Sequence, residues 1–172
     1  MSKYIKLIIF IILLLIISAA VIFIDSSINN MNELMPSISE GIVKGDNAYN
    51  DAVDLVNDKN FEESMNKAIS AGNYYNDSLS KLRTIQNNLT SDVNQVHKDY
   101  INYTISELEL KLLAVDKLKD AIDCFKINHN YTGSGYADEA NEYMNSSLEY
   151  RDARDALVSK NPKLFKQNSL FK

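Results

Sequence analysis

Histidine and cysteine most often carry metal, nucleophilic or proton-transfer chemistry, and this sequence holds two histidines and one cysteine. A di-metal helical bundle needs Glu-x-x-His pairs, but Asn94 and Lys126 stand three residues before His97 and His129. Cys124 sits between Asp123 and Phe125, and nothing in the sequence marks its thiol as activated. We therefore expect no metal or cofactor, Cys124 as a small apolar filler, and His97 at the surface or its boundary.

Paired carboxylates can perform general acid–base catalysis when burial moves their pKa values apart. The acidic pairs Glu62/Glu63 and Glu107/Glu109 fall on the polar faces of the helices that we expect, where solvated charge is the usual outcome. No nucleophile elbow, phosphate-binding loop, HExxH motif or calcium loop occurs in the sequence. The sequence thus predicts no catalytic residue, no cofactor-binding residue and a non-enzymatic protein.

Tyrosine provides large contact area at low cost in side-chain entropy, and it is enriched at interfaces. Tyr49, Tyr75 and Tyr100 fall on apolar stripes, so we expect them in or beside the core. Four others are better placed to be exposed and to bind a partner: Tyr103, Tyr131, Tyr143 and Tyr150.

Five Asn-x-Ser/Thr triplets mark glycosylation acceptors if the host glycosylates exported proteins, and they have no meaning otherwise. They begin at Asn76, Asn88, Asn102, Asn130 and Asn145. Asn130 in a turn and Asn88 at a helix junction are expected to be the most accessible.

The element that determines where all these residues lie is the uncharged run Leu7–Ile24. A bilayer needs about 20 apolar residues in a helix, so we expect a transmembrane helix here that includes Leu7, Ile12, Leu15 and Ile24. Residues 1–6 contain two lysines, and acidic residues occur only after position 24. The positive-inside rule then predicts a single-pass cell-membrane protein with a cytoplasmic N-terminus and an external C-terminal part.

A cleaved signal peptide is the alternative, because Ser18-Ala19-Ala20 supplies small residues after an apolar stretch. Cleavage after Ala20 would expose the apolar segment 21–24 as a new N-terminus, so we favour an uncleaved anchor. Both interpretations export the rest of the chain.

The exported part is acidic. Two of the 18 basic residues precede position 25, so residues 25–172 hold 16 basic and 23 acidic residues, a net charge of −7. Nucleic-acid binding needs a positive surface, so we expect no nucleic-acid partner.

Residues 25–159 are expected to form an all-α, elongated, antiparallel bundle of about four helices. Apolar residues recur at helical spacing over 37–58, 61–89, 93–127 and 136–159. Ser37 with Glu40 is spaced as a capping box, Asn60 is expected to be an N-cap, and the turn formers of 128–135 separate the last two helices.

The segment 160–172 is a basic, partly apolar tail. Its basic residues are Lys160, Lys163, Lys166 and Lys172. It is either a frayed terminus or a segment that rests on anionic headgroups or an anionic cell-wall polymer.

Together these features predict a membrane-anchored extracytoplasmic interaction module in a cell-envelope or surface complex. The apolar stripe of 61–89 contains Gly72 and Gln86, so another chain could complete it in a homodimer or hetero-bundle. The alternative is a ligand-sensing bundle that acts through a separate membrane partner.

Overall fold

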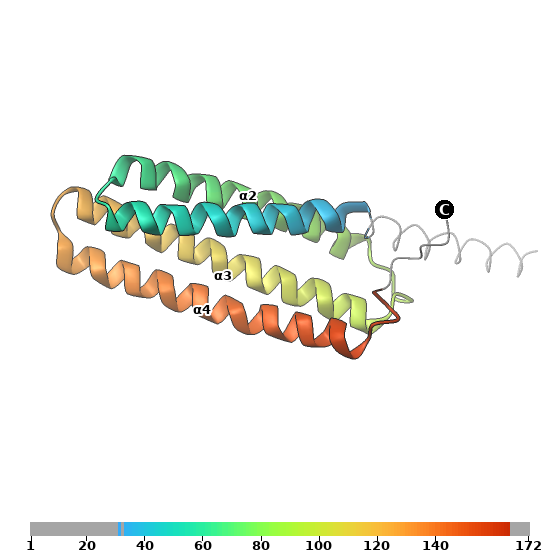
Figure 1. Cartoon of the computed structure of the whole chain (residues 1–172). Helices are drawn as coiled ribbons and strands as arrows, with labels where there is room; N and C mark the ends of the chain where they lie inside the picture. The colour runs from blue at the N-terminus through green and yellow to red at the C-terminus, as the bar shows by residue number, and fades with distance from the viewer. Residues whose placement is uncertain (1–30, 32, 166–172) are drawn as a thin grey trace, which may run out of the picture.

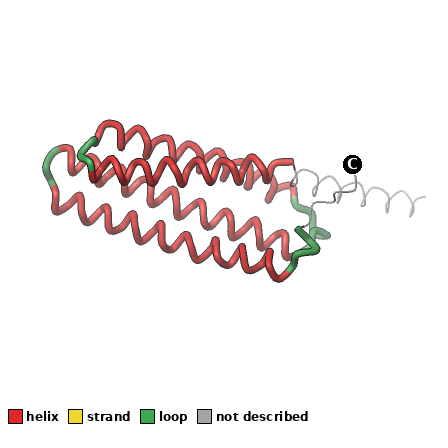
Figure 2. The backbone as a smooth tube through the Cα atoms, viewed as in Figure 1, coloured by secondary structure: helices red, strands yellow, loops and turns green. Residues whose placement is uncertain are grey.

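The computed structural model describes residues 31 and 33–165, which form four helices and no strand (Figures 1 and 2). The first helix includes residues 31 and 33–57 and is followed by α2 (Phe61–Asn88), α3 (Gln95–Lys126) and α4 (Asn130–Lys160). The predicted all-α helical bundle is therefore confirmed.

The predicted membrane-spanning residues Leu7, Ile12, Leu15 and Ile24 lie outside the described residues, as does the tail beyond position 165. Within the described part, none of the helices combines the length and the apolar character that a membrane crossing requires.

Successive helices run in opposite directions and lie side by side along the bundle (Figure 1). The start of the first helix and the end of α4 lie together at one end, which we call the termini end. The turns at 58–60 and 127–129 lie at the opposite end, which we call the turn end. α3 packs against both α2 and α4.

The apolar stripe of α3 supplies much of the core. Ile101, Leu108 and Ile122 are fully buried, as the sequence predicted. Burial of each such side chain contributes about 1.5–3 kcal/mol relative to leaving it in water. α3 therefore contributes a large share of the core.

α2 meets the first helix through small side chains that the sequence analysis did not place in the core. Ser64, Ala71 and Ser78 are buried there, whereas Gln86 of the predicted stripe is exposed. Ser64 Oγ donates to the carbonyl of Ala52 at 2.7 Å, and Ser78 Oγ donates to the carbonyl of Ile38 at 3.3 Å. These bonds satisfy the buried hydroxyls and let the two helices approach closely.

Both turns at the turn end have the same geometry. Lys59 and Asn128 adopt φ values of 60° and 59°, and the amides around them bond back to the preceding helix in a Schellman pattern. The amide of Asn60 reaches the carbonyl of Leu55 at 2.9 Å, and the amide of His129 reaches that of Cys124 at 2.9 Å. Each turn therefore satisfies helix-end carbonyls internally.

Two predicted helix starts were wrong. The first helix already includes Pro36, and Ser37 Oγ donates to the carbonyl of Leu34 at 2.9 Å, so Ser37 is not an N-cap. α4 begins at Asn130 instead of Tyr136. Gly133 explains the longer helix, because a Cβ there would lie 2.7 Å from Phe125 Cε1, and glycine lets α4 pack directly on that ring.

The predicted cap of α2 was right in position and different in chemistry. α2 begins after Asn60, but the side-chain amide of Asn60 donates to the Glu63 carboxylate at 2.7 Å. The Asn60 side chain makes no capping bond to the backbone. Asn94 caps α3 in the usual way, because its side chain accepts the amide of Val96 at 2.9 Å.

Candidate functional site: an ionic chain beside a cleft

Charged side chains cross the core and, together with the hydroxyl of Tyr75 in α2, connect all four helices. Lys111 of α3 is 1% exposed, and its Nζ lies 2.7 Å from Asp46 Oδ1 and 3.0 Å from Glu107 Oε1. The Tyr75 hydroxyl of α2 donates to the same Asp46 oxygen at 2.7 Å. One buried ammonium thus joins carboxylates of the first helix and α3.

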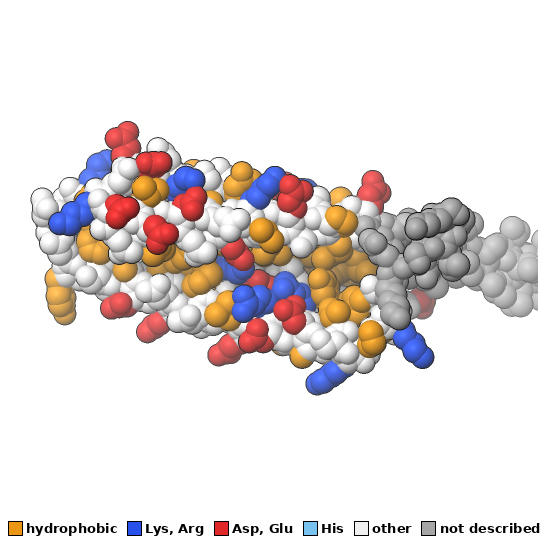
Figure 3. All heavy atoms as spheres, in the orientation of Figure 1, with side chains coloured by type: hydrophobic (Ala, Val, Ile, Leu, Met, Phe, Trp, Pro, Cys, Tyr) orange, Lys and Arg blue, Asp and Glu red, His pale blue; other side chains and the backbone are white. Residues whose placement is uncertain are grey.

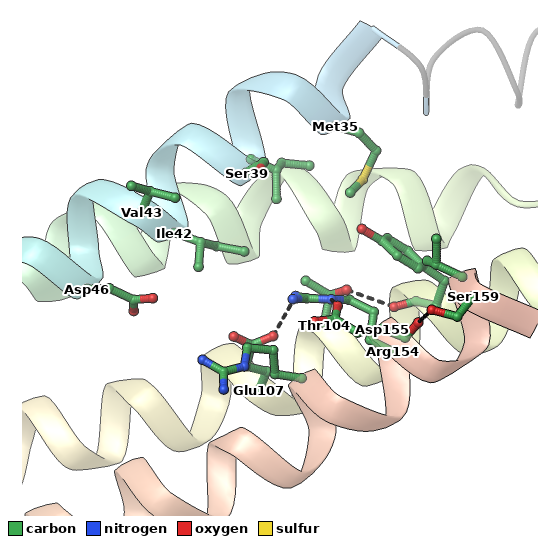
Figure 4. A pocket seen from close by; sticks show the side chains of 14 residues that line it. Met35, Ser39, Ile42, Val43, Asp46, Thr104, Glu107, Arg154, Asp155 and Ser159 are labelled. Atoms are coloured by element: carbon green, nitrogen blue, oxygen red, sulfur yellow. Dashed lines mark hydrogen bonds and ion pairs between the residues drawn. The ribbon is translucent and has the colours of Figure 1, made fainter. Parts of the chain in front are cut away.

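Glu107 extends these contacts to α4. It is also 1% exposed, and its Oε2 accepts a 2.6 Å hydrogen bond from Arg154 Nη1. Arg154 Nε lies 3.2 Å from Asp155 Oδ1 (Figure 4). We call these six residues the ionic chain: Tyr75, Asp46, Lys111, Glu107, Arg154 and Asp155.

The ionic chain restricts how the helices can pack. Burial of a charge costs several kcal/mol unless an opposite charge and hydrogen bonds compensate. Signs alternate along the chain, so a shift of one helix by a turn would separate Lys111 or Glu107 from a partner. Burial also raises the pKa of the Tyr75 hydroxyl, and Asp46 raises it further, so this hydroxyl remains a donor near neutral pH.

A cleft of about 520 Å³ lies between the first helix and α4, with α3 as its floor (Figure 4). This volume is within the range of small-molecule sites. Four apolar residues of the first helix form one wall, which we call the apolar strip: Met35, Ile38, Ile42 and Val43. On the face shown in Figure 3, the surface is hollowed between these helices, with apolar side chains toward the termini end and charged ones near the middle.

A smaller pocket of about 160 Å³ adjoins the cleft, since Asp46 and Arg151 line both. We call it the side pocket; Tyr49, Lys111 and Met144 also line it. Tyr49 is 4% exposed, and its hydroxyl has no hydrogen-bond partner among the described residues. Burial raises the pKa of Tyr49 to about 12, so the hydroxyl is an unused neutral donor.

The four tyrosines proposed for partner binding do not form one patch. Tyr103 and Tyr150 lie with ring centroids 6.5 Å apart, across α3 and α4. Tyr143 packs against the hydrophobic core, whereas Tyr131 is 95% exposed in the first turn of α4 at the turn end. The structure therefore separates one tyrosine pair from a single protruding tyrosine.

All five acceptor asparagines are exposed: Asn76, Asn88, Asn102, Asn130 and Asn145. Three of the triplets end in a buried hydroxyl residue, at Ser78, Thr104 and Ser147. Asn130 heads the one triplet whose three residues are all exposed. Whether any of them carries a sugar stays a prediction.

The two histidines and the cysteine do not come together as a metal site in the described part of the chain. His97 is buried, contrary to expectation, because residues 161–165 pack on the start of α3. The His97 Nε2 lies 3.2 Å from the Leu164 carbonyl oxygen. A carbonyl can only accept a hydrogen bond, so Nε2 carries the proton. The His97 ring also contacts the Phe165 ring edge-on. Cys124 is half-buried and its thiol is free. Among the described residues, no three His, Cys, Asp or Glu side chains gather as a metal site.

The ionic chain and the cleft were not predicted from the sequence, although a signal for the former exists. Thr104, Glu107 and Lys111 are spaced by three and four residues among the apolar positions of α3, so a helical projection places them facing inward. Asp46 and Arg154 carry no comparable signal, because they belong to helices with more polar faces.

The chain matches no family model, no curated protein and no solved structure.

Proposed function

We propose that the protein is a single-pass, membrane-anchored extracytoplasmic bundle that acts without catalysis, as an interaction module in a cell-envelope complex. The observation that carries this proposal is the uncharged run Leu7–Ile24 in a chain whose described ends lie together at the termini end (Figure 1). With an anchor before the first helix, the turn end would point away from the bilayer.

The turn end offers features suited to a protein partner. Ile127 and Tyr131 are large, exposed side chains there, and aromatic residues are enriched at interface centres. The paired rings of Tyr103 and Tyr150 are a second contact point along the bundle. A second copy of this chain is included among the partners proposed.

The topology is tested with a tag after Lys172 in the native host. Protease is added to intact cells, and the tag and the membrane fraction are then sized. Loss of the tag with a fragment retained in the membrane is expected. Protection that persists after removal of the cell wall would place the bundle in the cytoplasm and overturn the proposal. A shorter, freely soluble product would instead show cleavage after Ala20.

The interaction is tested with a benzophenone amino acid at Tyr131 of the full-length chain in intact cells. Irradiation should give one discrete cross-linked species above the monomer. The same group at Tyr143, which packs on the core, is the matched control and should give none. Equal cross-linking from both positions would contradict a partner at the turn end.

Ligand sensing through a separate membrane partner is a second candidate, and the cleft is the observation that favours it. The cleft separates the first helix, which follows the proposed anchor, from α4. A ligand that contacts both helices would alter their spacing, and the first helix could convey that change toward the membrane. Binding of a small molecule in the cleft would distinguish this function from a purely structural contact.

A further inference from the structure

We propose that the cleft and the side pocket bind a small amphipathic carboxylate, with its head on Arg151 and Tyr49 and its body along the apolar strip. This inference rests on the second function, ligand sensing, and gives it a ligand class. It does not depend on the turn-end partner or on the direction of membrane insertion.

The head-group site is positive within an acidic protein. The charged residues that line the side pocket are Asp46, Lys111 and Arg151, which sum to one positive charge. Lys111 already contacts two carboxylates, Asp46 at 2.7 Å and Glu107 at 3.0 Å. The unmatched charge therefore belongs to Arg151.

Arg151 is available to a ligand. Its side chain is 44% exposed, and its ion-pair contact among the described residues joins Nε to Asp152 Oδ1 at 3.6 Å, beyond hydrogen-bond range. Arg154, by contrast, already contacts Glu107 and Asp155. A guanidinium binds a carboxylate through two parallel hydrogen bonds, and the unused Tyr49 hydroxyl can donate a third.

The apolar strip suits a short aliphatic body. Met35 and Val43 are eight positions apart, which is about 12 Å at about 1.5 Å per residue. Val43 is 56% exposed, so part of this apolar surface is uncovered. A cleft of about 520 Å³ is large enough for one short aliphatic chain.

The test uses the full-length chain in nanodiscs of uncharged lipid, with methionine methyl groups labelled for NMR. Octanoate is the probe. Met35 lines the cleft and Met144 lines the side pocket, so both methyl signals should shift in a saturable manner. Met65 of α2 lines neither site and is the internal control. Absence of shifts at Met35 and Met144 would overturn the inference.

Matched probes test the charge of the ligand head, and matched variants test where that head binds. Octanamide and octylammonium have the same chain length, so equal shifts with either would overturn the assignment of an anionic head.

Arg151→Gln should weaken octanoate binding about tenfold or more, because it removes a charge-assisted pair. Arg83→Gln removes the same charge from an exposed pair with Glu109 and should leave binding unchanged. Equal loss in both variants would contradict the site.

Failure of this test leaves the proposed anchored module intact, because the protease and cross-linking experiments measure topology and the turn end. Success with octanoate and loss of binding in Arg151→Gln would support sensing independently of those results.

Discussion

Lys111 is the residue on which the ionic chain depends most, because it holds two carboxylates and is almost excluded from water. Lys111→Met keeps a similar length and removes the charge, which leaves Glu107 with Arg154 as its remaining cation. Removal of one partner from a buried ion pair costs about 3–5 kcal/mol. We expect a loss of that size in urea unfolding of the full-length chain in a non-ionic detergent, followed by circular dichroism.

Lys119→Met is the matched control, because Lys119 pairs with Asp116 on the exposed face of the same helix. Exposed pairs contribute about 0–1 kcal/mol, so this variant should unfold close to the parent. Similar losses in the two variants would mean that the contacts of Lys111 contribute no more than an ordinary surface pair.

Individual residues of α3 show which burial can be predicted from the sequence and which cannot. Periodicity located Ile101 and Leu108 in the core because apolar type and spacing agree. Glu107 was assigned to the solvent on type alone, and its burial depends on Arg154, 47 residues away in the sequence. A buried charge is predictable only with its partners, and those follow from which helices are neighbours.

Glycines decide how closely the helices approach. Gly45 of the first helix faces the Tyr75 ring, and a Cβ there would lie 2.6 Å from Tyr75 Cδ1. Gly45→Ala should therefore displace Tyr75 from Asp46 and lower the free energy of unfolding by about 1–3 kcal/mol. Gly135→Ala is the control, because its Cβ would meet nothing within 4 Å. That variant should gain about 0.5–1 kcal/mol from helix propensity. The two opposite shifts of the urea midpoint test the packing, and shifts of the same sign would contradict it.

The turn after the first helix predicts the direction of a second change in stability. Lys59 adopts φ 60°, a left-handed conformation that costs a residue with a Cβ about 1–2 kcal/mol. Lys59→Gly should therefore stabilise the chain by about 0.5–1 kcal/mol, with part of the gain lost to the freer unfolded chain. Lys126→Gly, in the last turn of α3, should instead cost about 1 kcal/mol. Thermal unfolding of both variants would decide, and a lower melting temperature for Lys59→Gly would contradict the assigned geometry.

Helix existence was predictable, whereas helix ends and one packing stripe were not. The runs of apolar residues in α2 and α3 are long enough to fix their type and approximate extent. The α2 stripe through Ser64, Ala71 and Ser78 was missed because serine is a polar residue type, which by itself predicts exposure. Here a carbonyl of the first helix accepts a hydrogen bond from each serine and so allows its burial. The start of α4 was missed because glycine is a turn former by type. The contact of Gly133 with the Phe125 ring, which favours glycine inside the helix, is visible only in the structure.

At the scale of the whole molecule, the charges reinforce the bundle topology. The ionic chain crosses from α2 through the first helix and α3 to α4, so no helix can leave without separating a contact. The cleft lies beside this chain, between the first helix and α4. A ligand there would act on the arrangement of the entire bundle.

Buried tyrosines make the folding of the bundle sensitive to high pH. Burial raises the pKa of Tyr49 to about 12 and also raises the pKa of Tyr75 and Tyr100. An unfolded tyrosine ionises near about pH 10, so above this pH the unfolded chain binds fewer protons than the folded chain. The contribution of each group is complete below about pH 10 and is lost as the pH rises toward its folded pKa. Stability should therefore fall steeply between about pH 10 and pH 12.

Tyr49→Phe isolates one part of this effect. The Tyr49 hydroxyl makes no hydrogen bond among the described residues, so the variant should lose little stability at neutral pH. At about pH 12 it should retain roughly 2 kcal/mol that the parent loses to ionisation of the unfolded state. All other ionisable groups are common to the two chains, so their contributions cancel in the comparison. Urea unfolding across this pH range measures the difference, and parallel stability curves for the two chains would show that Tyr49 ionises as freely in the bundle as in the unfolded chain.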